Sequence, residues 1–150
     1  RRQRQMCIRD SDTFFARIAA ETRADAFLFD TFSNPSAQQI DERLEGFVRR
    51  IRESHPTTPL IFLQTEVRES GNFDLKKRAF EDAKREAARK GMEKILETDK
   101  NIWFINPGME LGDDHEATVD GVHPTDLGFE RMLKKVQPQI IRILQKHGIK

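Results

Sequence analysis

Apolar and polar residues along this chain follow two patterns, one helical and one typical of buried strands. Apolar residues recur at about 3.6-residue spacing in four segments, which predicts amphipathic helices. Three short, largely apolar runs lie between these segments and suit buried strands. The expected helices cover residues 11–22, 36–54, 75–97 and 125–146, and the expected strands cover residues 24–30, 60–65 and 102–105. Strands that alternate with helices form a parallel sheet covered on both faces, so we expect one small α/β domain.

Local signals refine the ends and faces of these helices. Ser11 is expected to cap the first helix, and Ser36 with Gln39 three residues later matches a capping box. Pro138 should kink or split the last helix, because proline lacks an N–H donor and its ring clashes with the preceding turn. The helix over residues 75–97 is expected to bury one apolar face, made of Leu75, Ala79, Phe80, Ala83, Ala87, Met92, Ile95 and Leu96.

Composition narrows the class of protein. The chain has 150 residues, 34% of them charged and 37% hydrophobic, which is typical of a globular domain rather than a disordered chain. A net charge of +1 gives no general attraction to nucleic acid or anionic lipid. No apolar run approaches the roughly 20 residues of a membrane-spanning helix. Cys7 is the only cysteine, which excludes an intramolecular disulfide and a cysteine-based zinc site.

The first ten residues, RRQRQMCIRD, follow neither period. The string MCIRDS resembles translated sequencing-adapter sequence, so we expect residues 1–10 to be a non-native segment and residues 11–150 to form the domain. A natural disordered basic tail is the alternative.

Candidate functional residues gather where the expected strands end. In open α/β sheets, ligands bind beyond the carboxyl ends of the strands. The segments TFSNPS, TEVRES and DGVHP all follow strands or the loop after one, and would meet there. Glu66 and Arg68 in the second segment could orient a substrate or brace the neighbouring loop, and solvated loop charges are the simpler alternative.

Asp120 and His123 have the spacing of an acid–base pair. A histidine acts as a general base when a carboxylate holds one ring nitrogen and the other faces a nucleophile. Gly121 permits the tight turn that this contact needs, and Pro124 suits the first turn of the next helix. The alternative is a surface loop whose Asp and His merely cap that helix.

Asn34 is the second candidate. It follows a strand directly, and a side-chain amide at that place can donate a hydrogen bond to a developing oxyanion. Ordinary turn formation by Asn before Pro35 explains the same residue without any chemistry.

Two longer stretches resemble one enzyme family. LGDDHEATVDGVHPTDLGFERM, from Leu111 to Met132, and ADAFLFDTFSN are similar to the late motif and the strand-then-Asn motif of the SGNH hydrolases, the GDSL-like lipases and acylhydrolases. Within them the chain most resembles a bacterial branch that often carries a β-rich domain before the hydrolase. The resemblance implies a three-layer α/β/α, flavodoxin-like fold, here N-terminally truncated with about three strands. It also implies that His123 is the general base, that Asp120 orients His123, and that Asn34 lines the oxyanion hole.

The chain departs from this family at its start. The family's first motif, Gly-Asp-Ser, is absent, and so is the second-motif glycine that donates to the oxyanion. Ser11 is a poor substitute for the serine, because no strand precedes it and it suits a helix cap. We therefore expect the chain as given to lack its nucleophile and to be inactive.

The resemblance implies an ester hydrolase with a Ser-His-Asp triad, acting on a small acyl ester such as an O-acetylated carbohydrate, without a cofactor or metal. A periplasmic or secreted location is in keeping with the family. Two other classes stay open. One is a non-catalytic flavodoxin-like binding domain, and the other is a metal-dependent hydrolase that uses His115, Asp120 and His123.

Overall fold

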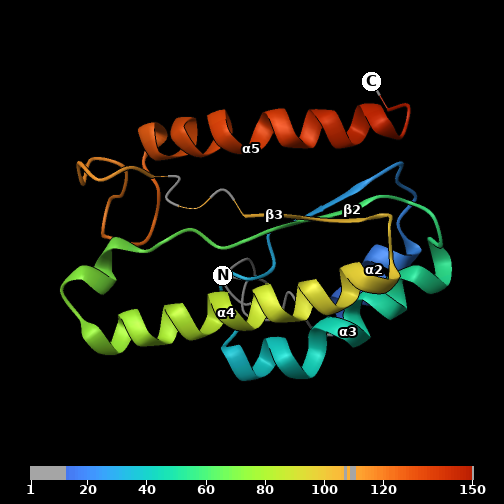
Figure 1. Cartoon of the computed structure of the whole chain (residues 1–150), viewed down its shortest axis with the longest axis horizontal. Helices are drawn as coiled ribbons and strands as arrows, with labels where there is room; N and C mark the ends of the chain where they lie inside the picture. Colours follow the sequence, from blue (N-terminus) through green and yellow to red (C-terminus); the bar gives the residue numbers. More distant parts are fainter. Residues whose placement is uncertain (1–12, 107, 109–110, 150) are drawn as a thin grey trace.

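The computed structural model describes residues 13–106, 108 and 111–149, which form one three-layer α/β/α unit (Figure 1). The expected alternation of helices and parallel strands is confirmed. The helices are α2 (Thr13–Glu21), α3 (Ala37–Ser54), the short 3-10 helix η1 (Glu69–Asn72), α4 (Leu75–Thr98) and α5 (Asp126–Lys146). The strands are β1 (Phe27–Phe29), β2 (Leu60–Leu63) and β3 (Ile102–Ile105). Ser11 and the segment 1–10 lie outside the described residues.

The sheet is parallel, with β2 between β1 and β3. Helices α2, α3 and α4 cover one face and α5 covers the other (Figure 1). Neighbouring residues of a strand point to opposite faces, so β2 contributes to two cores. Phe62 packs with Ile40 and Met92 on the three-helix side, whereas Ile61 packs with Val136 and Ile143 of α5. The fully parallel arrangement brings the three carboxyl ends to one edge of the sheet.

Capping and strand length agree with the sequence to different degrees. The Ser36–Gln39 capping box is present, with both reciprocal hydrogen bonds. The first two strands are shorter than expected, because β1 does not include residues 24–26 or Asp30, and β2 does not include Gln64 or Thr65. No helix in the described ranges is both long enough and apolar enough to cross a membrane.

Two expectations about the helices are corrected by the structure. Helix α5 is continuous through Pro138, so the proline does not split it, and a kink at this residue stays a prediction. Pro138 lies on the solvent side of the helix, so water can satisfy the carbonyl that loses its N–H donor. In α4 the expected apolar face is exposed in its first half, with Leu75 and Phe80 in solvent, because this half extends past the carboxyl edge of the sheet (Figure 1). The buried residues of α4 are Lys84, Ala87, Ala88, Met92 and Ile95.

Candidate active site

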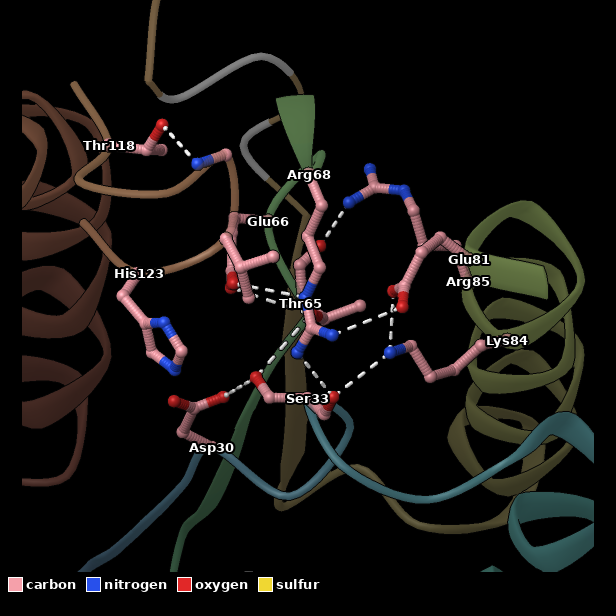
Figure 2. Close-up of polar contacts among 12 residues, drawn as sticks. Asp30, Ser33, Thr65, Glu66, Arg68, Glu81, Lys84, Arg85, Thr118 and His123 are labelled. Atoms are coloured by element: carbon pink, nitrogen blue, oxygen red, sulfur yellow. Dashed lines mark hydrogen bonds and ion pairs between the residues drawn. The ribbon is translucent and has the colours of Figure 1, made fainter. Parts of the chain in front are cut away.

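The turns after β1 and β2 and the loop before α5 meet at the carboxyl edge of the sheet. Ser33 Oγ, after β1, lies 3.4 Å from Thr65 Oγ1, after β2. In Figure 2 the imidazole of His123 points from its loop towards the ends of these two strands, where Asp30 and Glu66 lie. Three segments far apart in the sequence therefore contribute side chains to one region.

Asp120 and His123 form a direct pair. Asp120 Oδ2 lies 2.7 Å from His123 Nδ1, and Asp120 Oδ1 accepts hydrogen bonds from the backbone N–H groups of Val122 and His123. The backbone bond from His123 is the largest cause, and the imidazole of His123 the second, of an Asp120 pKa lowered to about 2. Asp120 is therefore ionised at neutral pH and can accept a hydrogen bond from the Nδ1–H group of His123. That contact leaves Nε2 as the nitrogen able to take a proton from a nucleophile.

The loop that carries this pair is fixed from both sides. Gly121 has φ +78°, and its carbonyl accepts a hydrogen bond from the Ser70 N–H at 2.9 Å. Glu69 accepts a 2.6 Å hydrogen bond from Thr118 Oγ1, which in turn accepts from the Gly121 N–H. Helix η1 therefore holds the Asp120–His123 turn at the edge of the sheet.

Pro124 does not lie in the first turn of α5 as expected. Thr125 is the N-cap, and its side chain accepts a hydrogen bond from the Gly128 N–H. Pro124 comes before the cap and pairs with Thr118 in an isolated antiparallel bridge. The proline thus closes the loop that contains the pair, instead of opening the helix.

Asn34 lies on the turn between β1 and α3 with its side chain in solvent, and the next residue, Pro35, is buried. Ser33, just before it, donates from its hydroxyl to Asp30 Oδ1 at 3.0 Å. Desolvation is the largest cause of a raised pKa at Asp30, and the hydrogen bond from Ser33 opposes it. The amide of Asn34 is accessible to a ligand, as an oxyanion donor must be, and its role remains a prediction.

Glu66 and Arg68 lie on the loop after β2 and are largely buried. Arg68 Nη2 donates to the Ser33 carbonyl at 2.6 Å, and Arg68 Nη1 lies 3.1 Å from Glu81 Oε1. Glu66 Oε1 lies 3.7 Å from Arg68 Nε. These contacts brace the neighbouring turn, which was one of the two roles expected for Arg68. Contact with substrate remains a prediction for both residues.

Sequence reasoning missed the residues beneath this turn. Lys84 is 1% exposed, and its ammonium donates to the Ser33 carbonyl at 2.9 Å and pairs with Glu81 Oε2 at 2.5 Å. The signal available was Glu81 and Lys84 three residues apart on α4. This pair lies within a run of residues of mixed charge that is typical of a solvated helix.

The two histidines of the metal-site alternative contact different carboxylates. His115 Nδ1 lies 3.1 Å from Glu69 Oε1, whereas His123 Nδ1 lies 2.7 Å from Asp120 Oδ2. In the part of the chain that the structure describes, no three His, Cys, Asp or Glu side chains are close enough together to hold a metal ion.

Comparison with known proteins shows which family this chain resembles. Residues 11–141 match the model of the GDSL-like Lipase/Acylhydrolase family. A protein from Bacteroides ovatus ATCC 8483, described as a GDSL-like lipase, superposes with a TM-score of 0.87 at 44% identity, and the match covers 91% of this chain and 41% of that one. No curated protein sequence matches this chain.

Two more distant structures share the fold. The salicylyl-acyltransferase SsfX3 from a tetracycline biosynthetic pathway has a TM-score of 0.65 at 21% identity, over 90% of this chain and 42% of that one. A carbohydrate esterase of family 3 from Talaromyces cellulolyticus has a TM-score of 0.64 at 15% identity, over 93% of this chain and 68% of that one. The chain thus spans less than half the length of the first two proteins. The family match over most of the sequence and the 44% identity establish that this chain belongs to the GDSL-like lipase/acylhydrolase family.

Proposed function

We propose that this chain supplies the acid–base half and one oxyanion donor of a Ser-His-Asp esterase site. The observation that carries the proposal is the 2.7 Å contact between Asp120 Oδ2 and His123 Nδ1, at the carboxyl edge of a parallel sheet. His123 is 76% exposed in its side chain, so its ring is accessible to a nucleophile from another segment. The serine belongs to a Gly-Asp-Ser motif, which does not occur in these 150 residues.

The mechanism is acyl transfer in two steps. The serine oxygen attacks the ester carbonyl while His123 Nε2 takes the proton of the serine hydroxyl. Asp120 stabilises the imidazolium that forms. The Asn34 amide donates a hydrogen bond to the tetrahedral oxyanion. His123 then protonates the leaving alcohol, and afterwards activates a water molecule that releases the acid and frees the serine.

An O-acetylated carbohydrate is the proposed substrate class. A groove of about 600 Å³ adjoins Asp120 and falls within the usual size of small-molecule sites. Phe73 and Val119 give it apolar surface, and Glu69, Lys77 and His115 give it polar groups. A sugar ring offers both kinds of surface, because its C–H faces pack on apolar side chains and its hydroxyls bond to polar ones.

The test uses a fusion in which residues 11–150 replace the matching part of the Bacteroides ovatus protein, whose unmatched part is expected to supply the nucleophile. We expect the fusion to hydrolyse p-nitrophenyl acetate in the presence of EDTA. His123→Ala should lower kcat by about 10⁴-fold or more, as loss of a triad member does.

His115→Ala is the matched control, because His115 is also exposed, lies on the same loop and also contacts a carboxylate. His115→Ala should leave kcat for p-nitrophenyl acetate unchanged, because this ester carries no sugar to contact the polar groups of the groove, whereas a metal-dependent hydrolase that uses His115 would lose activity and would be inhibited by EDTA. Equal rates for the fusion and its His123→Ala variant would overturn the proposal. The chain by itself should show no turnover above background.

A further inference from the structure

Four charged side chains gather beneath the turn that carries Asn34. They are Glu66, Arg68, Glu81 and Lys84, with side chains exposed by 14%, 17%, 12% and 1% (Figure 2). Their formal charges sum to zero. Placing charges in the interior costs desolvation energy, and a buried ion pair is often no more stabilising than apolar residues of similar volume. Stability is therefore a weak explanation for this cluster.

The cluster converges on one backbone atom. The Ser33 carbonyl oxygen accepts hydrogen bonds from Arg68 Nη2 at 2.6 Å and from Lys84 Nζ at 2.9 Å. Glu81 contacts both cations, at 3.1 Å from Arg68 and 2.5 Å from Lys84. The loop after β2 and helix α4 thereby hold the same peptide group. The nitrogen of that peptide group belongs to Asn34.

The other side of the turn is also fixed. Ser36 caps α3 two residues after Asn34, with the Gln39 side chain accepting from the Ser36 N–H at 2.9 Å. Asn34 is thus the exposed residue between two anchored ones. Catalytic donors must be held to within about 0.5 Å of their productive position, and supporting residues usually provide this precision.

We propose that Lys84 is a positioning residue, which with Glu81 and Arg68 holds the Ser33–Asn34 peptide so that the Asn34 amide meets the oxyanion. This inference rests on the proposed function, in which Asn34 is the oxyanion donor. Lys84 touches no reacting atom and acts only through the turn. Its removal should therefore weaken an interaction that is made in the transition state, and should leave binding of the ground-state ester unchanged.

A double-mutant cycle in the fusion esterase tests this role. Asn34→Ala should lower kcat by about 10²- to 10³-fold, as loss of an oxyanion donor does. Lys84→Met should lower kcat by about 10-fold or more with KM unchanged. In the Asn34→Ala background, Lys84→Met should have almost no further effect, because residues that act through the same contact are not additive.

Lys94→Met is the matched control on the same helix, since Lys94 is 71% exposed and pairs with Glu45 on α3. It should not change kcat. The charge-balanced variant Glu81→Leu/Lys84→Met removes a cation and an anion together, so it keeps the fold if Lys84→Met alone does not. It should reproduce the kcat loss and the lack of additivity.

A second measurement uses the chain itself and needs no activity. In ¹⁵N relaxation, the Asn34 backbone amide should have an order parameter near 0.85, and Lys84→Met should lower it below about 0.6, with Lys94→Met unchanged. An unchanged Asn34 amide would overturn the inference, and so would a Lys84→Met effect on kcat that adds fully to that of Asn34→Ala. Full kcat in Asn34→Ala would instead contradict the oxyanion role in the proposed function.

Discussion

Gly121→Ala tests how closely the site loop is held against η1. Gly121 has φ +78°, in the left-handed region, which costs a residue with a Cβ roughly 1–2 kcal/mol. A Cβ built on Gly121 would lie 3.0 Å from the Ser70 nitrogen and 3.2 Å from its Cα. Both are backbone atoms and cannot move aside alone. The loop must retreat and weaken the hydrogen bond from the Ser70 N–H to the Gly121 carbonyl, at about 1 kcal/mol.

The expected total loss for Gly121→Ala is therefore about 2–3 kcal/mol of the free energy of unfolding. Gly148→Ala is the matched control, because Gly148 has φ +74° but no atom within 4 Å of a built Cβ. It should lose only the conformational part, roughly 1–2 kcal/mol. Urea unfolding followed by circular dichroism measures both, as a shift of the midpoint at constant slope.

The comparison also has a functional readout. In the fusion esterase, Gly121→Ala should lower kcat, because the retreat moves the turn that holds Asp120 against His123, whereas Gly148→Ala should not. Equal stability losses in the two variants would refute the reasoning, since they would mean that the close approach to Ser70 places no constraint on the loop.

Three further outcomes are expected. The folded-state pKa of Asp120, about 2, lies below its ordinary value of 3.8, so its ionised form stabilises the fold above about pH 4 and this contribution is lost as the pH falls towards 2. Asp120→Asn should therefore lower Tm at pH 7 and lower it less at pH 2, and a gap independent of pH would contradict this linkage. Gly128→Ala should lower the free energy of unfolding in urea by about 1–3 kcal/mol, because a Cβ at residue 128 would lie 2.2 Å from the Ala117 carbonyl oxygen. Gly46→Ala, where no atom lies within 4 Å of the added Cβ, should instead raise the free energy of unfolding by up to about 1 kcal/mol. Leu28→Lys should reduce self-association in light scattering, because β1 pairs only with β2 among the described residues and Leu28 is 53% exposed on this edge strand. Leu133→Lys on α5 is the control, since Leu133 is equally exposed, and an equal effect of both substitutions would exclude strand pairing as the cause.

Sequence patterns located most elements because local physics sets them. The Ser36–Gln39 capping box and the helix that follows depend on residues within a few positions of one another. The Asp120–His123 contact is also local, since a turn with a glycine at positive φ closes it over three residues. The order of strands and helices followed from the same short-range periods.

The faces of α4 could not be predicted in this way. Its period placed Phe80 in the core and did not mark Lys84, yet Phe80 is 50% exposed and Lys84 is 1% exposed. Burial of Lys84 depends on the partners that surround it. Its desolvation is the largest cause of a lowered pKa, and Glu81 opposes that shift. Glu81 is a local partner, three residues away, but nothing in the local sequence indicates that the Ser33 carbonyl will be present as well.

The sequence by itself determined the order of the elements, the parallel sheet and the pairing of Asp120 with His123. Only the tertiary structure decided that Lys84 reaches the Ser33 carbonyl across 51 residues, and that Glu69 holds Thr118 across 49. The physical reason is the range of the interactions involved. Caps, turns and periodicity depend on residues that are close together in the sequence. The contacts that hold the Asn34 turn and the Asp120–His123 loop form only when the sheet brings distant segments to the same edge.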